Sequence, residues 1–249
     1  MYNPFSLQGK NILVTGASSG IGRAVAIECS KMGARVFITA RNTERLNETY
    51  ASLEGGRHQV FVADLLKEDD IYGIEREISG NLDGIVNCAG INQLLPFQFV
   101  DRADLISIFE VNFFVPTLLT RLLVKKKRLS KNASIVFISS ISGVYCSGIG
   151  ASMYSATKGA INGMVKGMAL DLAPKGIRVN CVNPGVVNTR IFESGVLTLE
   201  QLEQEKHKYP LKRFGNPEEV AFAVIYLLSD TTRWITGTNL LIDGGFTLM

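Results

Sequence analysis

The sequence predicts an α/β fold: a doubly wound parallel sheet of about seven strands with helices on both faces. Two observations support this. Short β-branched runs alternate with longer stretches of helical period, which is the pattern of βαβ units. The runs are also apolar throughout, as expected for strands covered on both faces. They are Ile12–Val14, Val36–Thr39, Val60–Val62, Gly84–Val86, Ile135–Ile138, Arg178–Val182 and Leu240–Ile242.

Length and composition fit one globular domain spanning residues 1–249. Hydrophobic residues make up 46% and charged residues 20% of the chain, which provides enough apolar material for a large core. The net charge of +3 is too small to predict a nucleic-acid partner. The four cysteines form no C-x-x-C pair and the two histidines have no metal-ligand spacing, so neither a disulfide framework nor a metal site is expected.

The chain start does not resemble a signal peptide, and no stretch is expected to cross a membrane. These features together predict a cytoplasmic protein with reduced thiols.

Two helices have clear boundaries in the sequence. Asn216 is followed by a proline and two glutamates, which predicts an N-cap, an N1 proline and a capping box for a helix to Leu228. A long helix is expected from Asp101 to the basic cluster Lys125–Arg128. That cluster favours the negative end of the helix dipole, and binding of an acidic partner is the alternative.

A glycine-rich loop follows the first strand. Gly16, Gly20 and Gly22 allow a tight turn and a close approach to a ligand, and the helix that begins directly afterwards ends at Gly33. The N-terminus of that helix offers free N–H groups to a phosphate. The spacing G-x-x-x-G-x-G differs from the usual dinucleotide fingerprint, so a simple tight connection is the alternative.

The end of the second predicted strand indicates the cofactor. In the usual fingerprint an acidic residue at this point binds the adenosine ribose hydroxyls. Here Ala40 and then Arg41 stand in its place. A guanidinium suits a ribose 2′-phosphate, which favours NADP(H) and leaves NAD(H) open. A solvated Arg41 is the alternative.

With these features the whole chain resembles the short-chain dehydrogenase/reductase family. The motifs are the TGASSGIG run, Asp64, Asn87-Cys88-Ala89-Gly90, Asn112, Ser140, Tyr154-Ser155-Ala156-Thr157-Lys158 and Asn183-Pro184-Gly185. The resemblance implies a Rossmann-like fold and hydride transfer between a nicotinamide and a carbonyl or alcohol.

The resemblance also implies the cofactor contacts. Asp64 and Leu65 would touch the adenine, and Thr189 would hold the nicotinamide amide. The alternatives are an Asx turn at Asp64, a strand-end cap at Asn87 and a helix N-cap at Thr189. The full set is Gly16, Ser18, Ser19, Gly20, Ile21, Gly22, Arg41, Asp64, Leu65, Asn87, Ala89, Gly90, Tyr154, Lys158, Pro184, Gly185, Val187 and Thr189.

The chemistry requires a proton donor, because hydride transfer to a carbonyl builds charge on oxygen. Tyr154 fits that role. A free phenol ionises only near pH 10, so a neighbouring positive charge is needed to stabilise the phenolate. Lys158 lies four residues on, on the same helix face, and the oxidised nicotinamide would add to its effect. The alternative is that both residues only pack or face solvent.

Two further residues complete the predicted catalytic set. Ser140 would hydrogen-bond the substrate oxygen, with Ser139 and Ser142 as competitors. The family commonly places this serine 13 positions before the tyrosine, whereas here Ser140 precedes Tyr154 by 14 positions, which places an extra residue in the loop 144–153. Asn112 would help relay protons to the lysine in the family, and the alternative is a bond to its own helix backbone.

A lid is expected at about residues 189–215, where open α/β sheets place their crevice. Ordinary packing is the alternative for the apolar residues that could line a substrate pocket there. They are Phe192, Val196, Leu197, Tyr145, Leu94 and Leu95.

Within the family the chain looks most like 3-oxoacyl-carrier-protein reductases and small-alcohol or sugar dehydrogenases. A 3-oxoacyl thioester is the preferred substrate, and a sugar or polyol is the alternative. An acidic carrier protein would suit Lys125–Arg128, Lys131 and Lys175, although the Thr-Arg-Asp that often follows Gly90 is missing. An NADPH-binding sensor and a structural subunit are the non-enzyme alternatives.

The family also implies an assembly. Its members are commonly homotetramers built from the two long helices and the C-terminal strand. Apolar residues on the first of these helices permit such a surface, namely Phe113, Phe114, Leu118 and Leu119.

Overall fold

The computed structural model describes residues 2–189 and 199–249. A seven-stranded sheet has the order β3-β2-β1-β4-β5-β6-β7, with every neighbouring pair parallel. The strands are β1 (Asn11–Thr15), β2 (Arg35–Ala40), β3 (Gln59–Val62), β4 (Leu82–Asn87), β5 (Leu129–Ile138), β6 (Arg178–Pro184) and β7 (Asn239–Ile242). Each contains one of the predicted runs, so the predicted fold class is confirmed.

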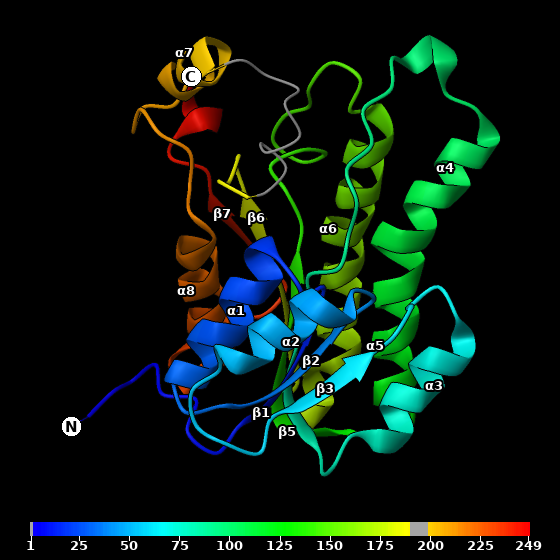
Figure 1. The fold of residues 1–249 in the computed structure, drawn as a ribbon, viewed down its shortest axis with the longest axis vertical. Helices are drawn as coiled ribbons and strands as arrows, with labels where there is room; N and C mark the ends of the chain where they lie inside the picture. The colour runs from blue at the N-terminus through cyan, green and yellow to red at the C-terminus, as the bar shows by residue number, and fades with distance from the viewer. Residues whose placement is uncertain (1, 190–198) are drawn as a thin grey trace.

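Helices cover both faces of the sheet (Figure 1). One apolar core joins the sheet to α1 (Gly20–Lys31), α2 (Thr43–Ala51) and α8 (Pro217–Leu228). A second core on the other face joins it to α3 (Glu68–Glu77), α5 (Val115–Lys125) and α6 (Ser152–Leu172). The sheet is therefore buried between two helical layers, which explains why its strands are apolar on both sides.

The predicted helix starts are confirmed. Asn216 and Glu219 form a reciprocal capping box at α8, which ends at Leu228. Asp101 and Asp104 do the same for α4 (Arg102–Phe109). The helix that begins at α4 continues through a π-helical turn, Glu110–Phe114, into α5. The predicted long helix therefore exists, with a local irregularity that the apolar pattern did not indicate.

The helical segment Arg102–Lys125 is long and apolar enough to cross a membrane by length and composition alone. Leu119, Leu122 and Leu123 pack into the core against the sheet, which accounts for much of its apolar character. Leu119 corrects one expectation, because it is completely buried and cannot belong to an exposed surface. Phe114 and Leu118 are exposed, as expected, and Phe113 is half-buried.

The segment after β6 leaves the sheet and returns to it. Val187 pairs with Gly215, and the Asn188 N–H donates to the Gly215 carbonyl over 2.8 Å. The described part contains α7 (Leu199–His207), within the stretch for which helical pieces were predicted. All four cysteines are free thiols, as expected.

Candidate active site

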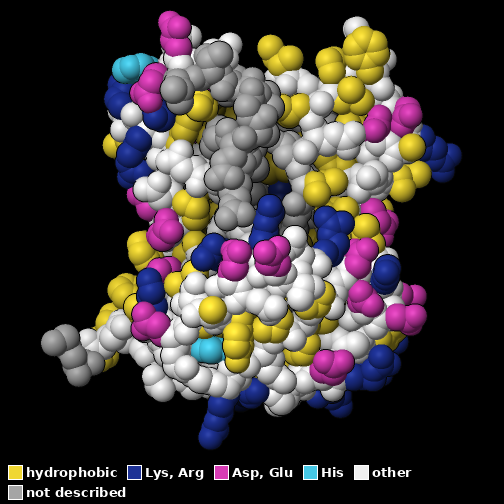
Figure 2. All heavy atoms as spheres, in the orientation of Figure 1, with side chains coloured by type: hydrophobic (Ala, Val, Ile, Leu, Met, Phe, Trp, Pro, Cys, Tyr) yellow, Lys and Arg dark blue, Asp and Glu magenta, His cyan; other side chains and the backbone are white. Residues whose placement is uncertain are grey.

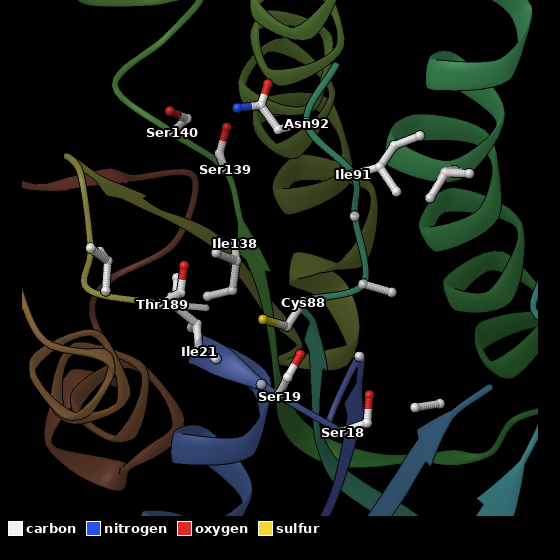
Figure 3. A pocket seen from close by; sticks show the side chains of 18 of the residues that line it. Ser18, Ser19, Ile21, Cys88, Ile91, Asn92, Ile138, Ser139, Ser140 and Thr189 are labelled. Atoms are coloured by element: carbon white, nitrogen blue, oxygen red, sulfur yellow. The ribbon is translucent and has the colours of Figure 1, made fainter. Parts of the chain in front are cut away.

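A cavity of about 940 Å³ lies along the carboxyl ends of the strands. Segments that follow β1 to β6 line it, and Figure 3 looks into it. The sheet order reverses between β1 and β4, and open α/β sheets bind ligands at such a point. Every predicted catalytic or cofactor residue lines this cavity except Asn87 and Asn112.

The glycine loop is shaped by close packing. Gly16 has φ +67°, and a Cβ there would lie 2.8 Å from the Ala89 Cα. A Cβ on Gly22 would overlap the Gly16 carbonyl. At the start of α1, Ser19 makes no side-chain capping bond and the first turn holds no acidic residue. The N–H groups and positive dipole of that helix end are therefore left for an anion, so the loop fits the phosphates of a dinucleotide.

Basic side chains gather near the rim of the cavity beside the N-terminus of α2 (Figure 2). Arg41, Asn42 and Arg45 all line the cavity there. In the part of the chain that the structure describes, neither arginine forms an ion pair with an acidic residue. Sequence reasoning identified Arg41 but missed Arg45, whose only signal was its spacing one helical turn from Arg41.

Asp64 combines both roles considered for it. Its Oδ1 accepts a hydrogen bond from the Leu66 N–H over 3.2 Å, which is an Asx turn. The residue also lines the cavity, as does Leu65. The turn therefore fixes Asp64 at the wall of the cavity, and its contact with adenine stays a prediction.

The structure separates Ser139 from Ser140. The Ser139 hydroxyl donates to the Lys158 carbonyl over 3.2 Å and accepts from the Asn162 amide over 2.6 Å. The Ser140 Oγ accepts one bond, from the Ser142 N–H over 3.1 Å. Ser140 thus keeps its hydroxyl hydrogen available to a ligand, whereas Ser139 is engaged on both sides. This geometry favours Ser140 as the substrate-binding serine.

Tyr154 and Lys158 lie one turn apart on α6, as the spacing predicts. The Lys158 Nζ is 5.6 Å from the centroid of the Tyr154 ring. The same ammonium donates to the Ile138 carbonyl over 2.9 Å, and the lysine is buried. A buried positive charge beside the phenol stabilises negative charge on it more strongly than one in water would. The pair is thus arranged for proton transfer.

Asn112 lies in the π-helical turn, a local form often found at functional sites. Its Oδ1 accepts from the Ile91 N–H over 2.8 Å. Its Nδ2 donates to the Ile91 carbonyl over 2.9 Å and to the Thr157 Oγ1 over 3.2 Å. These partners lie outside its own helix, so the alternative of a bond to its own helix backbone is wrong. Asn112 connects the loop after β4 to α6, the helix that carries Tyr154 and Lys158.

Asn87 lies behind the cavity. Its Nδ2 donates to Thr120 on α5 over 3.0 Å, and the residue is buried. The Thr15 hydroxyl accepts from the N–H groups of Cys88 and Ala89, each over 3.1 Å. The turn after β4 is therefore fixed to its neighbours, with Ala89 and Gly90 facing the cavity and Asn87 supporting them.

The expected apolar substrate pocket is not the one observed. Leu94, Leu95 and Tyr145 do not line the cavity, and the Tyr145 hydroxyl instead donates to the Asn239 carbonyl over 3.2 Å. Lining residues that sequence reasoning missed include Ile91, Asn92 and Val111. Their signal was position, directly after a strand or beside Asn112. The other three expected residues, Phe192, Val196 and Leu197, lie outside the described residues.

The basic cluster lies at the opposite end of the sheet. Lys125–Arg128 end α5 immediately before β5, and Arg128 pairs with Glu75 over 2.7 Å. Lys175 precedes β6 at the same end. The cavity is at the carboxyl ends of these strands, about 17 Å away along the five residue steps from Leu82 to Asn87 on β4, which pair with Leu129 to Phe137 on β5. Within one chain the cluster therefore does not border the cavity.

Comparisons with known proteins identify the family. A family model described as enoyl-(acyl carrier protein) reductase matches residues 16–247. A 3-oxoacyl-[acyl-carrier-protein] reductase of Aquifex aeolicus is 36% identical, over 96% of this chain and 98% of its own length. Glucose 1-dehydrogenase of Gluconobacter oxydans is 34% identical, over 96% and 92%.

Among solved structures, a short-chain dehydrogenase/reductase of Serratia marcescens superimposes with a TM-score of 0.88 at 31% identity, covering 98% of this chain and 100% of that one. The sequence, the sheet order and the cavity all agree with these matches. The chain therefore belongs to the short-chain dehydrogenase/reductase family of nicotinamide-dependent oxidoreductases.

Proposed function

We propose that the protein reduces a carbonyl with NADPH, or runs the reverse reaction, and that its preferred substrate is a 3-oxoacyl thioester. The observation that carries the proposal is the meeting of Ser140, Tyr154 and Lys158 in the cavity that the glycine loop also lines. A sugar or polyol is the second candidate, favoured by the relative named glucose 1-dehydrogenase.

The residues divide the chemistry among them. When bound, the nicotinamide supplies or accepts a hydride. The Ser140 hydroxyl donates to the substrate oxygen and orients it. Tyr154 donates its proton to that oxygen as charge develops on it. Lys158 stabilises the resulting phenolate with its buried ammonium. Asn112 keeps the loop after β4 against α6.

The preference for NADP(H) rests on Arg41. Its guanidinium lines the cavity at the end of β2, and no carboxylate follows the strand at the position that would bind ribose hydroxyls. Charge-assisted hydrogen bonds contribute about 1.5–3 kcal/mol each. Arg41→Ala should therefore weaken NADPH binding about tenfold or more, as measured by nucleotide fluorescence, and leave NADH binding nearly unchanged. Arg76→Ala, an exposed arginine on α3, is the control.

The substrate is tested by a panel of carbonyls. We expect NADPH absorbance to fall with 3-oxoacyl thioesters, either free or presented on an acyl carrier protein, faster than with ketoses or polyol ketones. The reverse order would favour the sugar candidate. Tight NADPH binding without oxidation against the whole panel would instead support a cofactor-binding sensor and overturn the proposed enzyme.

The segment 189–215 is proposed as a lid over the substrate. The chain enters and leaves this segment beside the cavity, where Val187 pairs with Gly215, and Thr189 lines the cavity.

We further propose a cytoplasmic homotetramer, supported by exposed apolar Phe114, at the end of the π-helical turn, and Leu118 on α5. Sedimentation or light scattering would measure the assembly directly.

A further inference from the structure

We infer that Asn162 is a positioning residue that fixes the distance between Ser140 and the Tyr154–Lys158 pair. The inference rests on the proposed function of these three residues. Asn162 lies on α6 one turn after Lys158, and its side chain is buried at 2% exposure. It does not line the cavity, so it cannot touch a substrate there. Its role must be exerted through the groups to which it is bonded.

The bonds of Asn162 reach all three elements that carry or support the site. Its Nδ2 donates to the Ser139 Oγ at the end of β5 over 2.6 Å and to the Lys158 carbonyl over 2.7 Å. Its Oδ1 accepts from the Asn183 Nδ2 on β6 over 2.9 Å. Asn183 in turn donates to the Ser140 carbonyl over 2.7 Å.

Lys158 is thereby tied to β5 at both of its ends. Its ammonium donates to the Ile138 carbonyl, and its own carbonyl accepts from the Ser139 hydroxyl. Asn162 supports this second hydrogen bond, because its Nδ2 donates both to the Ser139 hydroxyl and to the Lys158 carbonyl. A lysine fixed at one end only could move its ammonium relative to Tyr154. The second tie therefore sets where the charge lies.

Breaking the hydrogen bonds around Asn162 also has a large cost in free energy. All of its groups are buried, and a buried polar group that loses its partner keeps the full cost of desolvation. An apolar residue at position 162 would leave the Ser139 hydroxyl with one fewer bond and the Asn183 amide with one donor unpaired. The end of β5, including Ser140, would then be free to shift, and misplacement by about 1 Å costs up to about a hundredfold in rate.

Strand β6, which carries Asn183, also offers a matched control for Asn162. Asn180 on β6 is completely buried and is also bonded on both sides. Its Nδ2 donates to the Ile235 carbonyl over 3.2 Å, and its Oδ1 accepts from the Thr238 N–H over 3.1 Å. These partners do not line the cavity. Asn180→Leu therefore removes an equally buried asparagine without touching the site.

The test compares Asn162→Leu with Asn180→Leu in the full chain. We expect Asn162→Leu to lower kcat about ten- to a hundredfold, with the KM for the carbonyl and the NADPH dissociation constant changed less than about threefold. Asn180→Leu should lower thermal stability and leave kcat within about twofold. Hydrogen exchange measured by mass spectrometry should accelerate over residues 139–142 only in Asn162→Leu.

Two outcomes would overturn the inference: a folded Asn162→Leu with wild-type kcat and exchange, or equal losses of kcat in both variants. If Asn162→Leu does not fold, Ser139→Ala decides. Ser139→Ala should lower kcat about threefold and accelerate hydrogen exchange over residues 139–142. Wild-type kcat and exchange in this variant would refute the proposed link between Ser139 and Lys158. Hydrogen exchange needs no substrate, so a wild-type protein that reduces no carbonyl would refute the proposed function and leave this test intact.

Discussion

The two sides of the cavity are built in different ways. On the phosphate side, the part lined by the glycine loop where we propose that the cofactor phosphates bind, Gly16, Gly20 and Gly22 lie within seven consecutive residues. This side depends on the shape of the backbone and on the free N–H groups at the start of α1. On the chemical side, the part lined by the proposed catalytic residues, Ser140 and Lys158 come from different segments and are linked through the buried side chains of Asn162 and Asn183. Local sequence therefore determines the first side, whereas long-range packing determines the second. The two sides should respond to mutation differently.

The largest effect is expected on the chemical side. Tyr154→Phe removes the proposed proton donor and leaves the glycine loop untouched. General acid–base catalysis contributes about 10²–10⁴-fold, so carbonyl reduction should fall by about a thousandfold. NADPH titration by fluorescence should give an unchanged dissociation constant. A variant that retains a tenth of the wild-type rate would show that another group donates the proton.

Replacement of the serine should have a smaller effect. Ser140→Ala removes one hydrogen bond to the developing negative charge, which should lower kcat about a hundredfold. Ser142→Ala is the matched control, because Ser142 also lines the cavity and contributes only its backbone N–H to Ser140. Steady-state kinetics of both variants would decide the assignment, and a larger loss in Ser142→Ala would reverse it.

The phosphate side should fail through sterics. In Gly16→Ala the new Cβ meets the Ala89 backbone at 2.8 Å in a left-handed conformation. We expect NADPH affinity to fall about tenfold and the melting temperature to drop. Gly163→Ala, at an exposed position on α6, meets nothing within 4 Å and should keep both values or raise stability slightly. Calorimetry with and without NADPH would measure both. Equal behaviour of the two variants would contradict the close packing of the loop.

The smallest effect is expected at Cys88, which lies between the two sides (Figure 3). Burial raises the pKa of its thiol to about 12, although the charge of Lys158 opposes that shift. A raised thiol pKa keeps the unreactive protonated form, so the thiolate is scarce below about pH 10. Iodoacetamide at pH 7.5 should leave Cys88 unmodified and NADPH binding intact, as measured by mass spectrometry and fluorescence. Rapid alkylation at neutral pH would show that the thiol is accessible.

Sequence patterns predicted the strands and the capped starts of α4 and α8, and together with the family resemblance they gave just over half of the residues that line the cavity. They succeeded because each depends on local signals, such as apolar runs, capping residues and glycines next to a helix start. The role of Asn162 was not predictable in this way, because its partners on β5 and β6 are about twenty residues away along the chain.

The sequence by itself determined the fold class, the glycine-rich turn before α1 and the shared face of Tyr154 and Lys158. Only the tertiary structure showed that the Ser139 hydroxyl is held in buried hydrogen bonds, that Leu119 packs in the core, and that the basic cluster lies at the other end of the sheet from the cavity. The reason is that periodicity fixes which residues share a face of one element. Which hydroxyl is hydrogen-bonded within the protein, and which face of a helix is buried, depends on the neighbours that packing brings together.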